Sequence, residues 1–329
     1  MTLRIPHRGL SFDMDESAVG QDSVPCPVCG GRRAHDLFTD RNRRENLPIA
    51  GTYSSCVGCG AIYLRKRPLW EDIKALYDPL HYGPGDGGRG AEERGGSSRW
   101  KGLVHWTRKW RFRPHSWPLE PAGRHPRRLL DVGCGDGRKL EEFAARGWEV
   151  WGIDVSPNAL RMAAARLPGG RFLAGELEGL DLPHGSFDVV RLDNVLEHVP
   201  RPVETLQICH RLLNPGGRLI CLVPHGKSLS MRVLGRYSIS AWVPFHLTLF
   251  TRGSLRRALE GAGFGRVALY DFCPLQWPAA SLFQLLKSPG WGNQRIPRWW
   301  IWACYPFGCA AAWMRVGEEL VAVATKEGT

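Results

Sequence analysis

The stretch that decides the fold is LLDVGCGDG, residues 129–137. Its first four residues form a short apolar run of the kind found in buried strands. Glycines then follow at Gly133, Gly135 and Gly137, where they let the backbone turn sharply and approach a ligand closely. A helix-like apolar pattern begins at Leu140. The sequence therefore predicts a strand, a glycine turn and a helix in immediate succession.

A second strand is predicted at residues 150–154, VWGID, and it ends in an acid, Asp154. An acid at this position can accept hydrogen bonds from both hydroxyls of a ribose. Ser156 and Pro157 then open the next helix, as N-cap and first helical residue. A dinucleotide site would place glycine where this chain has Arg138, and the sequence contains no P-loop motif. The pattern therefore favours a nucleoside ligand without a pyrophosphate.

The remainder of the 329 residues is long enough for more than one domain. Strand-like and helix-like patterns alternate over residues 128–274, which predicts an α/β domain with a parallel sheet. We divide the chain into a flexible tail (1–24), a cysteine-rich unit (25–68), a linker (69–127) and an α/β domain (128–329). Within this domain, a hydrophobic insert (275–316) lies between a predicted sixth strand, Arg266–Phe272, and a last strand, Glu318–Lys326.

Five motifs in the α/β domain resemble those of class I S-adenosylmethionine-dependent methyltransferases, particularly the group that includes ubiquinone-biosynthesis and glycan methyltransferases. They are residues 129–137, GIDVS at 152–156, GELEGLDLPHGSFDVV at 175–190, VLEHV at 195–199 and LLNPGGRLI at 212–220. The resemblance implies a Rossmann-like seven-stranded sheet, methyl-transfer activity and S-adenosyl-L-methionine as the cofactor.

The resemblance also implies roles for individual residues around the cofactor. Asp193 would face the transferred methyl group and the acceptor, whereas Asp188 is expected to cap a turn. Asp131, Gly133, Gly135 and Gly137 would line the methionine end, Asp154 would hold the ribose, and Glu176 and Leu177 would lie beside the adenine, where many relatives carry an aspartate.

Four cysteines in two C-x-x-C pairs form the second chemical signal: Cys26, Cys29, Cys56 and Cys59. Glycine follows each pair, so two tight turns can direct four thiolates at one Zn²⁺ ion and leave no open position for water. The alternatives are four unrelated buried cysteines or a redox pair. We expect a structural zinc ribbon at 25–68, a unit that resembles the zinc-binding region preceding some sugar methyltransferases.

Methyl transfer to a hydroxyl or an acidic C–H also requires a proton acceptor, and histidine suits that role near neutral pH. His198 follows the predicted fourth strand, His225 follows the fifth, and His246 precedes a helix capped by Thr251. We select His246 and His198 as candidate catalytic bases, with Asp193 beside them. A structural role for each histidine, and catalysis by alignment alone, remain open alternatives.

Two segments indicate possible contact with a membrane. Residues 99–113 (RWKGLVHWTRKWRFR) have the pattern of a basic amphipathic helix, which can lie on an anionic membrane or on nucleic acid, or pack on the α/β domain. Residues 299–314 contain no charge, are too short to span a bilayer, and are interrupted by Pro306 and Gly308. We expect this segment to form either an interfacial lid for a lipid-linked acceptor or a dry lid over a soluble one.

Composition limits the remaining choices. The net charge of +12 makes an anionic partner plausible. Residues 1–24 lack the apolar core of a secretory signal, so we expect a cytoplasmic protein. If the membrane contact holds, we expect the protein at the inner face of the membrane. The leading hypothesis is a methyltransferase acting on a glycan, a lipid-linked intermediate or a quinone-like metabolite. An RNA methyltransferase that uses the zinc ribbon and the basic surface is the alternative, and a non-enzymatic docking domain is a third interpretation.

Overall fold

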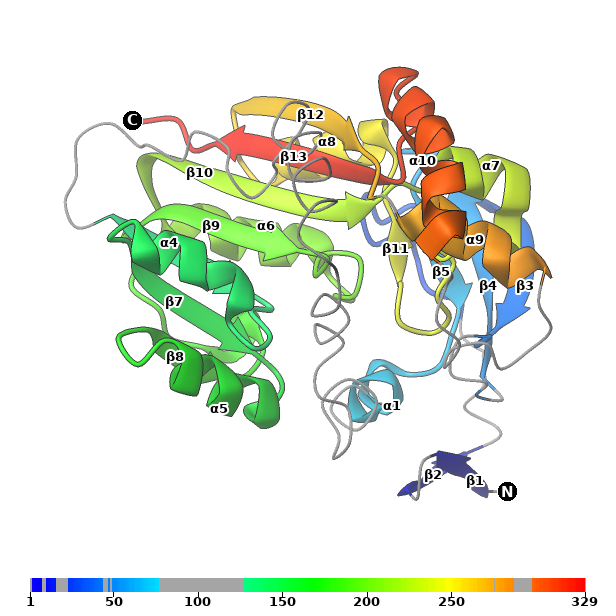
Figure 1. Ribbon diagram of the computed structural model, residues 1–329, viewed down its shortest axis with the longest axis horizontal. Helices are drawn as coiled ribbons and strands as arrows, with labels where there is room; N and C mark the ends of the chain where they lie inside the picture. Colours follow the sequence, from blue (N-terminus) through cyan, green and yellow to red (C-terminus); the bar gives the residue numbers. More distant parts are fainter. Residues whose placement is uncertain are drawn as a thin grey trace.

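The computed structural model describes residues 2–7, 10–15, 23–43, 47, 49–76, 127–274, 276–286 and 298–328. Its centre is a seven-stranded sheet in the order β12-β13-β10-β9-β6-β7-β8, shown in Figure 1. Its strands are β6 (Arg128–Val132), β7 (Glu149–Asp154), β8 (Arg171–Ala174), β9 (Phe187–Asp193), β10 (Leu213–Pro224), β12 (Arg266–Phe272) and β13 (Glu319–Thr325).

Five neighbouring strands of this sheet, from β8 to β10, run parallel, whereas β13 is antiparallel to both β10 and β12. The carboxyl ends of the parallel strands consequently share one edge, which is where open α/β sheets bind their ligands. The Rossmann-like seven-stranded sheet expected from the sequence is confirmed. Strand β12 has the expected limits, and β13 lies one residue inside the expected last strand at each end.

Helices cover both faces of the sheet, and each face has its own apolar cluster. One cluster includes residues of α6 (Pro202–Leu212) and α8 (Arg252–Gly261), and the other includes residues of α4 (Glu141–Ala145) and α5 (Pro157–Arg166). Ser156 caps α5 by accepting a hydrogen bond from Ala159 N, and Thr251 caps α8, as the sequence predicts. The strands between these layers are almost completely buried, because side chains on both of their faces are covered.

A second, four-stranded sheet has the order β11-β5-β4-β3. Strands β3 (Ala34–Arg41), β4 (Ala50–Cys56) and β5 (Ile62–Lys66) come from the cysteine-rich unit, but β11 (Thr248–Leu249) comes from the α/β domain. In Figure 1, β11 lies beside β5 at the junction of the two sheets. Helix α1 (Trp70–Ala75) follows β5 and lies at the same junction.

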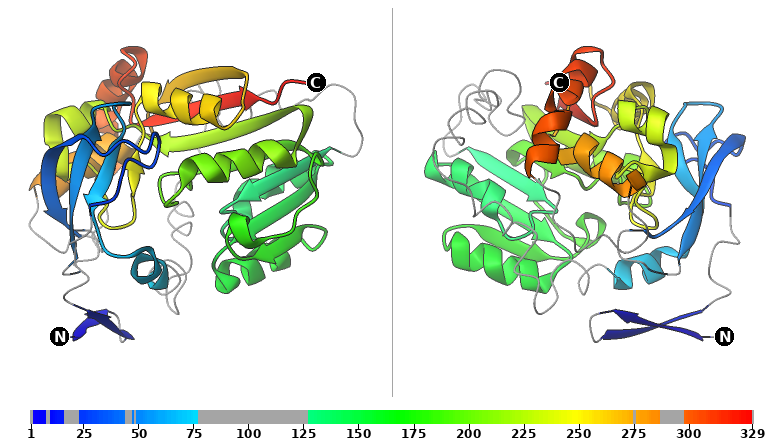
Figure 2. Two further views of the ribbon diagram at one scale, coloured as in Figure 1. Left: turned by 180° about the vertical axis from the view of Figure 1, so that it is seen from behind. Right: turned by 45° about the vertical axis from the view of Figure 1, so that its right-hand side comes forward.

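The hydrophobic insert forms two helices, α9 (Gln276–Leu286) and α10 (Arg298–Trp313), and Figure 2 shows α10 projecting from the body of the molecule. Helix α10 runs through Pro306, so the sequence expectation of an interrupted segment was wrong. Helix α7 (Leu229–Leu234) packs against α9. Within the described part of the chain, no helix has the length and apolar character needed to cross a bilayer.

Near the N-terminus, β1 (Thr2–His7) and β2 (Leu10–Asp15) form a separate antiparallel hairpin. This hairpin lies within the segment where the sequence shows no periodicity. The predicted basic amphipathic helix at residues 99–113 falls outside the described residues.

Candidate active site

The glycine turn after β6 has the backbone geometry that only glycine adopts without strain. Gly133, Gly135 and Gly137 have φ values of +71°, +56° and +72°. Gly133 N donates to Ile153 O at 2.7 Å, which ties the turn to β7. A Cβ atom at Gly133 would lie 2.4 Å from Cγ2 of Val195, so the turn also meets the segment that follows β9. The turn is therefore a close-fitting backbone cradle at the carboxyl edge of the sheet.

Asp154 locks the cradle from the neighbouring strand. Its Oδ2 accepts a hydrogen bond from Gly135 N at 2.8 Å, and its Oδ1 accepts one from Ser156 N at 2.9 Å. A carboxylate offers about four lone-pair sites, and these two bonds use two of them. The residues present therefore fit a ribose whose two hydroxyls donate hydrogen bonds to the Asp154 carboxylate, which is held in a fixed orientation.

A buried charge network lies beneath the cradle. Arg191, which is 1% exposed, pairs with Asp193 and, at 3.4 Å, with Asp131. Lys139 also pairs with Asp193, with 2.6 Å between Nζ and Oδ2. Burial raises the pKa of Asp131, and the Arg191 guanidinium opposes this shift. Arg191 thus joins two of the carboxylates selected from the sequence, and Lys139 adds a second cation beside Asp193. Sequence reasoning missed both cations.

The arginine carried a signal in the sequence, because it interrupts an otherwise apolar strand, FDVVRLD, whose residues are all buried. An arginine in such a strand needs a buried acidic partner. Lys139 had no comparable signal, because a single lysine near a helix is usually exposed to solvent.

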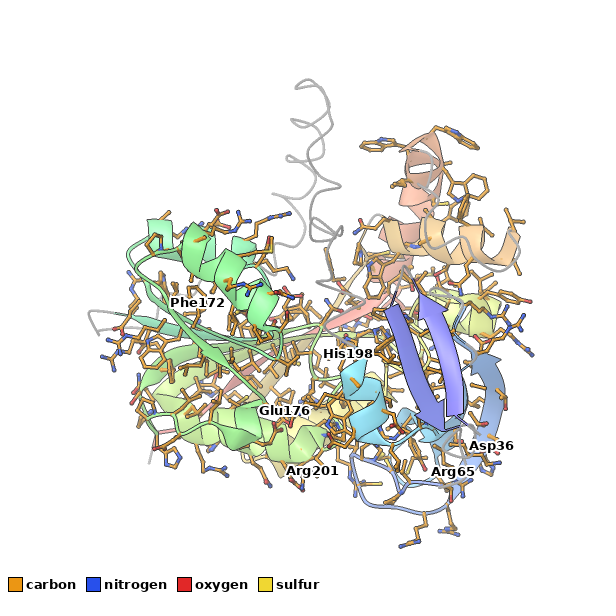
Figure 3. All side chains as sticks on the ribbon, turned by 90° about the horizontal axis from the view of Figure 1, so that it is seen from below. Asp36, Arg65, Phe172, Glu176, His198 and Arg201 are labelled. Carbon is orange, nitrogen blue, oxygen red and sulfur yellow. The ribbon has the colours of Figure 1, made fainter. Side chains whose placement is uncertain are left out.

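Glu176 lies between the α/β domain and helix α1, as Figure 3 shows. Its Oε1 is 2.9 Å from Lys74 Nζ and accepts a hydrogen bond from Trp70 Nε1 at 3.3 Å. The Glu176 carboxylate raises the pKa of Lys74. Leu177, by contrast, is buried in the core. Helix α1 therefore reaches the residue expected beside the adenine, a contact that sequence reasoning did not anticipate.

Glu197, His198 and His246 form a compact cluster beyond the end of β9. One ligand-type atom from each lies within 4.8 Å of the others, so this trio has the spacing to share a metal ion. The two imidazole rings meet edge to face, with 4.8 Å between their centroids. Sequence reasoning selected both histidines separately, and the structure brings them together although they are far apart in the chain.

The hydrogen bonds of this cluster fix the histidine tautomers. His198 Nδ1 is 2.9 Å from Phe245 O, and His246 Nδ1 is 2.8 Å from Ser240 O. Because a carbonyl can only accept, each Nδ1 carries the hydrogen, and each Nε2 has the lone pair. Burial lowers the pKa of His198 to about 4, so the ring is neutral at physiological pH.

Two acids at this edge of the sheet have raised pKa values, which favour their protonated forms. Burial raises the pKa of Glu197 well above its usual range. Burial and the Asp193 carboxylate raise the pKa of Glu319 to about 8. Asn194 donates to both Asp193 and Glu319, at 3.0 and 3.2 Å. The edge of the sheet next to the cradle therefore combines burial with perturbed pKa values, which is typical of active sites.

Other polar residues considered from the sequence have structural partners. Asp188 accepts from Arg128 N at 2.8 Å and from Asn214 Nδ2 at 3.0 Å, so it joins distant chain segments instead of capping a turn as the sequence analysis expected. His225 Nδ1 is 3.1 Å from Gly317 O, and His210 packs edge to face on Phe264.

The four cysteines converge as the sequence predicts. Their Sγ atoms lie within 4.8 Å of one another, and the Cys26–Cys59 and Cys29–Cys56 separations are both 3.5 Å. The hydrogen bond with Cys59 lowers the pKa of Cys26 to about 5, so this thiol ionises readily. Four convergent sulfurs with no disulfide among them are a donor set that suits tetrahedral zinc. Bound there, the ion would close the two turns and leave no position for a substrate.

Comparisons with known proteins agree with this geometry. Residues 108–269 match the family model described as a methyltransferase domain. The chain is 36% identical over 138 residues to a ubiquinone biosynthesis O-methyltransferase of Pseudomonas aeruginosa (strain LESB58), covering 37% of this chain and 59% of that protein. It is 39% identical over 123 residues to the protein of the same name from Alkalilimnicola ehrlichii, covering 35% and 49%.

Among solved structures, a SAM-dependent methyltransferase from Archaeoglobus fulgidus is similar over 77% of this chain and 99% of its own, with a TM-score of 0.44 and 19% identity. Residues 108–269 thus match a methyltransferase domain model, and the relatives that cover part of this region are named methyltransferases. The two curated relatives described here are both named ubiquinone biosynthesis O-methyltransferase. The match spans 59% of the length of the first and 49% of the length of the second.

Proposed function

We propose that this protein transfers a methyl group from S-adenosylmethionine to the hydroxyl of a small-molecule acceptor. The observation that carries the proposal is the position of the Glu197–His198–His246 cluster. Glu197 and His198 follow Val195, which lies against the Gly133 turn, and His246 joins them from a later segment of the chain. A proton acceptor is thereby held beside the cradle for a methyl donor. Relatives named O-methyltransferases support the same class of reaction.

The cofactor supplies an activated methyl group, so the protein mainly has to align the acceptor and exclude water. Asp154 and the glycine turn would hold the nucleoside, and His198 or His246 would accept the proton from the acceptor hydroxyl at Nε2. A histidine with a pKa of about 4 is a weak base. It therefore suits an acidic hydroxyl, such as that of a phenol or hydroquinone, better than an aliphatic alcohol.

The test uses labelled cofactor with catechol and hydroquinone probes. We expect His246→Gln and His198→Gln each to lower the methyl-transfer rate about 10²-fold or more, because general-base catalysis contributes at least that much. Binding of S-adenosylhomocysteine should be retained in both variants. His210→Gln, which changes a histidine packed on Phe264, is the matched control and should keep full activity. If all three variants transfer methyl groups as fast as the unsubstituted protein, a histidine base is ruled out.

Helix α10 supports an acceptor that is presented by a membrane. Trp299, Phe307 and Trp313 are 67%, 68% and 77% exposed, and Trp302 and Met314 are exposed as well. Neither α9 nor α10 contains an acidic residue. An exposed tryptophan-rich helix without acids, on a chain of net charge +12, suits the headgroup region of an anionic membrane.

Flotation tests this part of the proposal. The intact protein should float with vesicles of phosphatidylglycerol and phosphatidylcholine, and Trp299→Ser/Trp313→Ser should not. Trp148→Phe removes a buried tryptophan and serves as the control. If the intact protein stays at the bottom of the gradient, α10 instead covers a soluble acceptor.

The RNA methyltransferase alternative has one observation in its favour. An open depression on the ribbon is lined by Arg32, Arg33, His35 and Arg65, and Figure 3 shows Arg65 on this unit next to Asp36. Arginine clusters bind phosphate. Filter binding of RNA whose affinity falls steeply with salt, and is lost in Arg32→Ser/Arg33→Ser, would favour this alternative over the small-molecule acceptor.

A further inference from the structure

The segment that carries His246 lies between the two sheets. We call residues 238–249 the strap: it connects the 3₁₀ turn Gly235–Tyr237 to the segment before α8 and ends in β11. Only residues 248 and 249 of the strap are in a strand, so most of its backbone polar groups must find partners outside regular secondary structure. Those partners come from two different parts of the chain.

On one side, the ribbon holds the strap by its carbonyl groups. Tyr53 Oη donates to His246 O at 2.8 Å, and Asn42 Nδ2 donates to Val243 O at 2.7 Å. Both donors are buried, at 0% and 1% exposure. Leu64 N adds a backbone hydrogen bond to Leu247 O at 2.9 Å.

On the other side, the strap holds the catalytic cluster. Leu247 N and Thr248 N both donate to Glu197 O, at 2.7 and 3.1 Å. Phe245 O accepts the hydrogen bond from His198 Nδ1. The carbonyl that orients His198 is therefore adjacent in sequence to the carbonyl that Tyr53 holds.

The side chains of the strap follow the same division. Val243 packs with Tyr53 and Leu64 of the ribbon in one apolar cluster. Phe245 and Leu247 pack with a second set that includes Ile49 and, from α1, Ile73. Neither cluster can form from the α/β domain alone, so the strap depends on the ribbon for its packing as well as for its hydrogen bonds.

We propose that the four-cysteine ribbon positions the His198–His246 pair, with Tyr53 and Asn42 as the positioning residues. This inference rests on the proposed function and deepens it. The ribbon acts without touching the substrate: it fixes the backbone at residues 243–247, which contains the carbonyl that orients His198 and the main chain of His246. A metal at the cysteines would close the two turns of the ribbon, and the sheet that begins at those turns supplies Tyr53.

Tyr53→Phe tests the proposal, because it removes one hydroxyl and retains the ring. Tyr63→Phe is the matched control: Tyr63 lies on the neighbouring strand, is equally buried, and its hydroxyl has no hydrogen-bond partner among the described residues. Asn42→Leu is a second variant of similar volume that removes the other donor to the strap. All three are prepared as the full chain, and thermal unfolding establishes that each is folded.

The first readout is the ring ¹⁵N spectrum of the histidines in the protein without acceptor. Tyr53→Phe and Asn42→Leu should shift the resonances of His246 and His198 and leave those of His210 and His184 in place, whereas Tyr63→Phe should shift none of these four. The second is methyl transfer to the catechol probe. We expect kcat to fall about 10- to 100-fold for Tyr53→Phe, because small displacements of catalytic groups have effects of that size. Affinity for S-adenosylhomocysteine should remain within about twofold.

The two readouts separate this inference from the function on which it rests. Unchanged histidine resonances in Tyr53→Phe overturn the positioning role, whether or not any acceptor is methylated. Shifted resonances support it even if the catechol probe proves to be the wrong acceptor. If kcat for the probe is unchanged although the resonances shift, the positioning of the histidines is irrelevant to catalysis and the inference fails.

Discussion

Gly133 shows at the scale of one residue why the cradle sequence has so little freedom. Its φ of +71° disfavours any side chain, and a Cβ there would also lie 2.4 Å from Val195. Gly147 has a similar φ of +79°, but a Cβ added to it would meet no atom of the described residues within 4 Å. A substitution at Gly147 therefore causes backbone strain alone, whereas one at Gly133 causes backbone strain and a steric conflict.

We expect Gly147→Ala to lower the free energy of unfolding by about 1–2 kcal/mol, the cost of a left-handed backbone for a residue with a Cβ. Gly133→Ala should lower it further and should also abolish binding of S-adenosylhomocysteine, because the cradle must open to release Val195. Urea denaturation and calorimetry measure the two effects. Equal losses of stability for the two variants would mean that the turn relaxes freely.

His225 makes stability depend on pH. Burial lowers its pKa from the ordinary histidine value of 6.5 to about 4. A histidine with a depressed pKa in the folded state contributes stability above pH 6.5, and this contribution is lost as pH falls toward 4. A shift of this size corresponds to about 3 kcal/mol.

His225→Asn retains a donor toward Gly317 O but cannot be protonated. Between about pH 7 and pH 4, its free energy of unfolding should fall by about 3 kcal/mol less than that of the unsubstituted protein. Urea denaturation at several pH values measures the difference, with His184→Asn, at an exposed position, as the control. Parallel pH profiles for all three proteins would contradict the assignment.

Among the elements, the four-cysteine ribbon is the one that a structural metal would stabilise most. Its sheet is small, and units of this size gain much of their folding energy from a structural ion. We expect the purified protein to contain about one zinc per chain. Cys56→Ser should lose the zinc, whereas Cys209→Ser, at a buried cysteine of α6, should retain it. Metal analysis by atomic emission decides this, and an unsubstituted protein without zinc would refute the ribbon site.

Element by element, the sequence predicted what local periodicity controls. The glycine turn, the cap of α5 and the limits of β12 follow from patterns within about ten residues. Helix α10 was harder, because the apolar packing of the insert allows a helix to continue through Pro306 despite the cost of a lost hydrogen bond.

Contacts between distant segments could not be predicted in the same way. Strand β11 is only two residues long and pairs with β5, which lies far earlier in the chain. The contact of Lys74 with Glu176 likewise joins two elements with no shared sequence pattern. The histidine pair was found residue by residue because chemistry selects histidine, but its assembly depends on these long-range contacts.

At the scale of the whole molecule, the ribbon and the α/β domain share one core. Cys26, Cys56 and Tyr63 of the ribbon belong to the same apolar cluster as Leu130 of β6 and Phe250 beside β11. The division at residue 68 drawn from the sequence therefore does not separate two independent cores. A substrate site between the sheets would be built jointly by both parts, with α1 at the cofactor end and the strap at the acceptor end.

The central claim is that the cradle and Asp154 bind a sulfonium nucleoside. Calorimetric titration of S-adenosylmethionine into the intact protein, Asp154→Ala and Asp188→Asn tests it most directly. Asp188 is a buried carboxylate at the opposite end of the same sheet and serves as the control. Each hydrogen bond to a charged group contributes about 1.5–3 kcal/mol, so Asp154→Ala should weaken binding at least tenfold while Asp188→Asn binds normally. Undiminished affinity in Asp154→Ala would contradict the account.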